Sequence, residues 1–142
     1  MRMFGNLLLF VPCVAVSCAN LGPNPYVQPQ AVNGPCTVKP FFIIRLSETP
    51  TEMKTENTGQ ACVISMFNPD LGAVQDAAFV SLQPAHGQAW TQIFGGDRGT
   101  VVVFYKPAAA YVGPDLFDVT FEPEARDVLF HVTVTPPGVP AG

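Results

Sequence analysis

The sequence predicts an all-β domain that folds as an antiparallel β-sandwich of about seven strands. Three observations support this fold class. Residues 117–121 and 128–134 alternate apolar and polar side chains, as half-buried antiparallel strands do. Gly and Pro residues separate the apolar runs. No long stretch has the 3.6-residue period of an amphipathic helix.

The chain has 142 residues, which is enough for one domain with its own core. Charged residues make up only 13% of it, about half the usual share, whereas hydrophobic residues reach 48%. The net charge of -4 and the scattered positions of the seven basic residues argue against a nucleic-acid partner, because phosphate binding needs clustered Lys and Arg. So few charges favour a protein that covers part of its surface with a partner.

Residues 1–19 have the pattern of a signal peptide. Arg2 precedes an apolar run at 7–11, and small residues follow before Asn20. The apolar run is too short to cross a bilayer, so we expect export. A cut after Ala19 would remove the whole segment. The alternative is a lipoprotein signal that ends before Cys18, which would then carry the lipid.

The predicted domain is preceded by a Pro-rich segment at 20–35. Its composition predicts a semi-rigid linker or, equally, a disordered start of the mature chain. Residues 36–136 form the predicted sandwich, and residues 137–142 form a flexible tail.

Seven strands are expected between these limits. The first is an edge-like strand made of Val38 and Phe41–Leu46. The polar residues of Ser47–Gln60 predict an exposed loop. A short turn of helix is predicted at Leu71–Asp76. The other strands are predicted at Ala61–Phe67, Ala77–Gln83, Gln88–Ile93, Thr100–Tyr105, Leu116–Glu122 and Val128–Thr135. The run at 101–105 is apolar at every position, which favours a central strand.

Cys36 and Cys62 remain in the chain under either reading of the leader, and in an oxidising compartment they form one disulfide. Closing a loop of about 27 residues would stabilise the fold by roughly 3.5 kcal/mol on the chain-entropy model. Because Cys36 begins the first predicted strand, we expect the bridge to tie neighbouring early strands rather than the two sheets.

Turn residues and aromatic residues between Pro84 and Phe117 stand at hairpin spacings. We expect Gly87 and Gly113 to adopt positive φ, and Asp115 to accept backbone amides in a turn. Pro107 should end a strand. The whole set is His86, Gly87, Tyr105, Pro107, Gly113, Asp115 and Phe117.

With these spacings, Ala77–Val134 resembles the bacterial cadherin-like and immunoglobulin-like domains of surface proteins. The resemblance implies an immunoglobulin-like sandwich in which His-Gly opens a hairpin, Tyr-x-Pro ends a strand and Gly-x-Asp-x-Phe begins the next strand. Three features depart from the family. Ala110 stands where Gly or Asn is common, and Pro123-Glu-Ala-Arg126 replaces the usual Asp-Gly hairpin before the last strand. One copy is present where the family has tandem repeats, so an adhesin role is not implied.

The sequence lacks the motifs of a serine-hydrolase elbow, a zinc protease and a phosphate loop, so we expect no enzyme, no cofactor and no metal site. We expect an exported interaction module, a subunit or accessory protein of a bacterial envelope or cell-surface assembly. It would lie in the periplasm, on the outer membrane through a lipid, or at the cell surface, and would bind protein partners or itself. The alternative is a module that binds carbohydrate or another ligand by stacking it on Trp90.

Overall fold

A computed structural model describes residues 26–27, 30–44, 46–66, 77–94, 100–122 and 125–139 of the chain. The predicted signal peptide with Cys18, and the helical turn predicted at 71–76, lie outside these residues.

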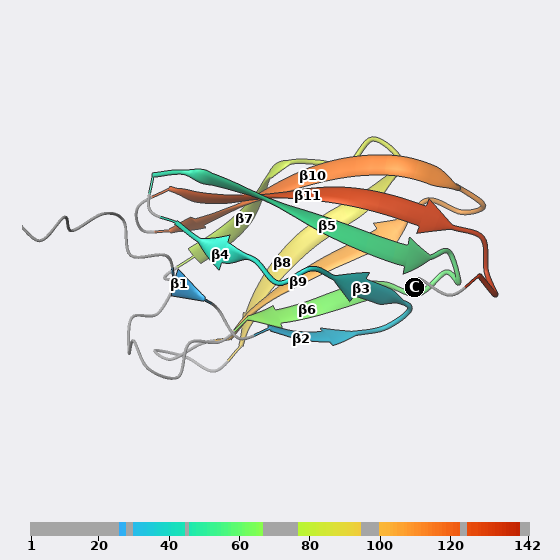
Figure 1. The fold of residues 1–142 in the computed structure, drawn as a ribbon, viewed down its shortest axis with the longest axis horizontal. Helices are drawn as coiled ribbons and strands as arrows, with labels where there is room; N and C mark the ends of the chain where they lie inside the picture. The colour runs from blue at the N-terminus through green and yellow to red at the C-terminus, as the bar shows by residue number, and fades with distance from the viewer. Residues whose placement is uncertain are drawn as a thin grey trace, which may run out of the picture.

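The described residues form two main sheets that pack face to face, as Figure 1 shows, so the predicted all-β sandwich is confirmed at this level. In sheet order, the five-stranded sheet contains β3 (Cys36–Val38), β5 (Glu48–Glu56), β11 (Arg126–Thr135), β10 (Gly113–Glu122) and β7 (Ala77–Leu82). The four-stranded sheet contains β2 (Gln30–Asn33), β6 (Cys62–Met66), β9 (Thr100–Pro107) and β8 (Gly87–Phe94). A small sheet pairs β1 (Tyr26–Val27) with β4 (Phe42–Ile43).

Strands β6 to β11 coincide with the predictions within a few residues at each end. The run at 101–105 lies in β9, which is a central strand between β6 and β8, as expected. The sandwich is not wholly antiparallel, because β5 runs parallel to β11. The five-stranded sheet is therefore mixed, whereas every pair in the four-stranded sheet is antiparallel.

β5 occupies most of Ser47–Gln60, so the prediction of an exposed loop there is wrong. Its inward positions include Thr51, Met53 and Thr55, and all three are buried. Thr51 Oγ1 donates a hydrogen bond of 2.9 Å to the carbonyl of Lys39, which satisfies a buried hydroxyl. The alternation escaped the sequence analysis because Thr, rather than an aliphatic residue, fills two of these inward positions.

β1 and β2 lie within residues 20–35, so part of the segment predicted as a linker pairs into the sheets. β2 pairs with β6 and packs Val32 against the core. Gly34 then carries the chain from the four-stranded to the five-stranded sheet. Its φ is 102°, and a Cβ at this position would lie 2.6 Å from the carbonyl oxygen of Ala61.

The predicted disulfide between Cys36 and Cys62 is confirmed, with 5.7 Å between the Cα atoms. Cys36 begins β3 and Cys62 begins β6, and these strands belong to different sheets. The prediction that the bridge ties neighbouring strands of one layer is therefore wrong. The crossover at Gly34 moves β3 away from β2, so the bridge pins the two sheets to each other.

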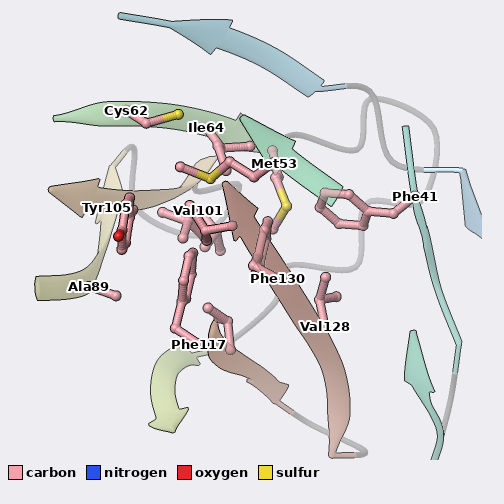
Figure 2. Packing of buried hydrophobic residues seen from close by; sticks show 14 of the residues in the cluster. Phe41, Met53, Cys62, Ile64, Ala89, Val101, Tyr105, Phe117, Val128 and Phe130 are labelled. Carbon is pink, nitrogen blue, oxygen red and sulfur yellow. The ribbon is translucent and has the colours of Figure 1, made fainter. Parts of the chain in front are cut away.

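A row of aromatic rings fills the centre of the sandwich (Figure 2). Tyr105 of the four-stranded sheet stacks on Phe117 at 5.3 Å between ring centroids, and Phe117 stacks on Phe130 at 4.6 Å. Phe41 meets Phe130 edge-on at 5.5 Å. All four rings are 2% exposed or less. Stacked and edge-on pairs of this kind stabilise a core beyond the area they bury, so this row sets the spacing of the two sheets.

We predict that replacing Cys36 and Cys62 together by Ala lowers the free energy of unfolding by about 3.5 kcal/mol, because the unfolded chain regains the entropy of an open loop. Urea unfolding of both proteins measures the difference. The same loss should follow reduction of the wild-type protein. A difference below about 1 kcal/mol would show that the disulfide adds little to the stability that the hydrophobic core already provides.

Candidate functional site

Asp115 is the most heavily bonded side chain among the described residues of the turn motif. It is 9% exposed, and its carboxylate accepts hydrogen bonds from the backbone N–H groups of Ala85 at 3.0 Å and His86 at 3.2 Å. It also accepts from the hydroxyl of Tyr105 at 2.8 Å and from the N–H of Leu116 at 3.0 Å. One carboxylate thus joins the turn before β8, the core strand β9 and the start of β10. The expectation that Asp115 accepts backbone amides is confirmed.

The Tyr105 hydroxyl is buried at the end of the aromatic row. Burial raises its pKa far above the ordinary value, and the hydrogen bond to Asp115 raises the pKa further. The phenol therefore stays protonated at neutral pH and is the donor of this hydrogen bond. This pair is structural, because both groups are enclosed by the fold.

The two motif glycines have different roles. Gly113 begins β10 with a φ of 138°, as predicted. Gly87 does not have positive φ, so that prediction is wrong. Instead, a Cβ on Gly87 would lie 2.6 Å from the carbonyl oxygen of Lys106, its neighbour across the strand pair. Gly87 is thus needed for close approach of two backbones, and Pro107 ends β9 opposite it, as expected.

The loop between β9 and β10 is held by a residue that the sequence analysis missed. Asn57 is buried, and its Nδ2 donates to the carbonyls of Ala108 at 2.8 Å and Tyr111 at 2.9 Å. Tyr111 also stacks on His86, with 4.1 Å between the ring centroids. Ala110 has a φ of 60°, a left-handed backbone conformation that Gly or Asn adopts more easily than Ala.

Trp90 lies on the outer face of the four-stranded sheet. It is partly exposed and stacks on Phe104 of β9, with 4.9 Å between the ring centroids and 1° between the ring planes. Phe104 pairs in turn with Val63 of β6. Gln88 and Gln92, both exposed, flank Trp90 on the same side of the edge strand β8. We call Val63, Gln88, Trp90, Gln92 and Phe104 the aromatic face.

The whole outer face of the four-stranded sheet, which contains the aromatic face, is almost uncharged. Outward positions of β2, β6, β8 and β9 carry Ala, Asn, Val, Ser, Gln, Trp, Phe and Thr side chains. Among the described residues of these strands, Lys106 is the single charged side chain at an outward position. A face without charges loses little hydration when it is covered.

The outer face of the five-stranded sheet is different, because it carries most of the charged side chains of the sandwich. Lys39 and Glu52 form an ion pair of 2.6 Å near β3. This pairing lowers the pKa of Glu52, with a smaller contribution from Lys54. An open hollow of about 670 Å³ lies at this end of the sheet, and His131 and Thr133 are among its lining residues.

Asp118 lies in the middle of this charged face. Its Oδ2 accepts a hydrogen bond of 2.8 Å from Ser81, whereas its Oδ1 is buried and has no hydrogen-bond partner. Desolvation raises the pKa of Asp118, the Ser81 hydrogen bond lowers it, and the neighbouring carboxylates of Asp127 and Glu48 raise it. Nearby Thr120, a polar residue of the alternating run at 117–121, is only 6% exposed and donates to Asp127 Oδ1 at 2.6 Å.

The part of the chain that the structure describes contains no group of three or more His, Cys, Asp or Glu side chains that could hold a metal ion. Within the same residues, no helix has the length and apolar character needed to cross a membrane.

We predict that Asp115→Asn lowers the free energy of unfolding by about 2–4 kcal/mol, because an amide nitrogen would replace one carboxylate oxygen and face donors instead of accepting from them. Chemical denaturation at neutral pH measures the loss. Asp127→Asn is the matched control, since Asp127 accepts one side-chain bond at a partly exposed position. Equal losses in the two variants would contradict the central role of Asp115.

We predict that Asp118→Asn changes how stability depends on pH. The folded-state pKa of Asp118 is raised above its unfolded value of about 3.9, so the folded state holds this proton more tightly. The stabilisation that comes from binding this proton more tightly in the folded state is fully present below about pH 4. It is lost as the pH rises through the folded-state pKa of Asp118. The wild-type protein should therefore lose stability relative to the variant as the pH rises above about 4 and through the folded-state pKa. Denaturation curves at several pH values test this, and parallel pH profiles would contradict it.

Comparison of the chain with protein-family models, with curated proteins and with solved structures finds no match in any of the three.

Proposed function

We propose that the protein is an exported, non-enzymatic interaction module with an immunoglobulin-like sandwich, which serves as a subunit or accessory protein of a bacterial envelope or cell-surface assembly. The observation that carries this proposal is the aromatic face. A sheet surface with a stacked Trp90–Phe104 pair and almost no charge suits a contact that excludes water. Aromatic side chains at the centre of a face, with amides around them, are typical of protein interfaces.

The strand order supports the immunoglobulin-like part of the proposal. Constant-type immunoglobulin domains have their first, second, fifth and fourth strands in one sheet and their third, sixth and seventh strands in the other. The order β2-β6-β9-β8 matches the first pattern, and β7, β10 and β11 match the second. β5 would then be an additional strand beside the last one. The bridge from β3 to β6 differs from the disulfide between the second and sixth strands of antibody domains.

The disulfide is compatible with export, since such bonds persist in oxidising compartments. Export through the segment at 1–19, with or without a lipid on Cys18, is part of the proposal. An intact mass of the mature protein distinguishes the two routes.

We predict that the aromatic face contacts the partner in the native envelope. A photo-crosslinking amino acid at Gln92 should yield a defined adduct with one partner, identified by mass spectrometry. Adding Trp90→Ala to the same protein should abolish the adduct, because the stacked pair that fills the contact is lost. A crosslinker at Thr133, on the outer face of the other sheet, is the matched control and should not form the adduct with that partner. An adduct that survives Trp90→Ala, or that forms equally from Thr133, would contradict the proposed contact.

A carbohydrate or similar neutral ligand is the second candidate for the same face. The flanking amides of Gln88 and Gln92 favour it, because amides beside an aromatic ring bond sugar hydroxyls while the ring stacks on the sugar. The chain has one Trp, so its fluorescence reports Trp90 alone. Saturable quenching by neutral oligosaccharides would favour the ligand-binding module, and unchanged fluorescence together with a protein adduct would favour the interaction module.

A further inference from the structure

The polar side chains on the outer face of the four-stranded sheet are complementary to copies of themselves. Gln88 and Gln92 of the aromatic face carry amides, and the neighbouring outward positions Asn33 and Ser65 add an amide and a hydroxyl. Each of these groups both donates and accepts hydrogen bonds, so it can pair with an identical group. Contacts between different proteins commonly select the partner by opposite charges, and the described outward positions of this sheet offer only Lys106 for that purpose.

Apolar side chains occupy the centre of the same outer face. Trp90 stacks on Phe104, and Val63 lies on the other side of Phe104 in the pairing register. Val102, the next outward position of β9, is 5% exposed although it faces away from the core. Phe94, at the end of β8 on the same side, is 53% exposed. An apolar centre with uncharged polar groups at its margins has the composition of an interface core.

The acidic side chains of the sandwich lie far from this face. Glu48, Glu52 and Asp127 are on the outer face of the five-stranded sheet. Because stacked sheets are about 10 Å apart, two copies joined at their aromatic faces would hold these acids about 30 Å from those of the other copy. This separation exceeds the Debye length of about 8 Å at physiological salt. The net charge of -4 therefore opposes such a contact only weakly.

We propose that the aromatic face binds a second copy of the chain in a two-fold symmetric dimer. The inference rests on the function proposed above and names the partner of that face. Because both copies present the same face to each other, the two-fold axis lies in the plane of the contact. Trp90 and Phe104 of both copies fill the centre of the contact, and Lys106 stays at its margin, near the end of β9.

The area of the face is enough for a weak dimer. The four strands, about 4.8 Å apart and with about 3.4 Å per residue, cover about 400 Å² per copy, or about 800 Å² in total. This total lies below the standard size of a stable interface, so the dimer forms reversibly and its population rises with concentration. We expect a dissociation constant on the order of 100 µM.

Sedimentation velocity of the purified protein between about 10 µM and 1 mM should show a reversible monomer–dimer equilibrium. Gln92→Lys puts a charge inside the contact on each copy and should weaken the dimer roughly tenfold to a hundredfold. Thr133→Lys is the matched control, because it adds the same charge at an exposed position on the outer face of the other sheet. It should leave the dimer unchanged.

Fluorescence shows whether the dimer forms at this face, because Trp90 is the single Trp of the chain. The emission of Trp90 should move to shorter wavelength as protein concentration rises, over the range in which sedimentation shows the dimer. In the Gln92→Lys protein the same shift should need a roughly tenfold to hundredfold higher concentration.

A wild-type protein that stays monomeric at about 1 mM overturns a second copy as the partner. So does a dimer that forms without a change in Trp90 emission, or an equal loss of dimer from Thr133→Lys. The crosslinker at Gln92 separates these failures from failure of the proposed function. An adduct with a protein of another sequence would keep the aromatic face as a contact surface, whereas the absence of any adduct would refute that proposal as well.

Discussion

The hydrogen bond from the Tyr105 hydroxyl to the Asp115 carboxylate is the interaction on which the rest of the structure depends. It lies where the two sheets meet the turn before β8, and the same carboxylate accepts the backbone N–H groups of Ala85 and His86. Burying a carboxylate is costly unless donors surround it, so moving any of these segments away would leave the Asp115 carboxylate buried with fewer donors. The contact therefore fixes β10 of the five-stranded sheet against the β8–β9 pair of the four-stranded sheet.

The pairing of β8 with β9 decides which side chains lie on the outer face of the four-stranded sheet. Because Tyr105 and Ala89 point into the core, their neighbours Phe104 and Trp90 must point outward and meet each other. The same alternation in β5 sends Thr51, Met53 and Thr55 inward. Lys54 and the acidic residues are thereby left on the opposite surface. The aromatic row and the two outer faces are thus products of one arrangement of alternating strands.

The outer faces of the two sheets differ in how many charged side chains they carry. The aromatic face has almost no charge to desolvate, so a partner can cover it at little electrostatic cost. The outer face of the five-stranded sheet carries acids and lysines side by side along β5, and Lys39 is paired there with Glu52, so covering this face would desolvate charged groups.

The sequence by itself determined the all-β class, strands β6 to β11, the disulfide pair and the turn at Gly113, because these follow from alternation, turn chemistry and cysteine count within short segments. Only the tertiary structure decided that β5 is a strand, that β2 lies in the four-stranded sheet, and that the disulfide joins the two sheets. It also decided that Asp115 collects donors from the turn before β8 and that Gly87 serves close approach. The physical reason is range: local patterns record which side of a strand is apolar, whereas sheet assignment and buried polar contacts depend on residues far apart in the chain that only packing brings together.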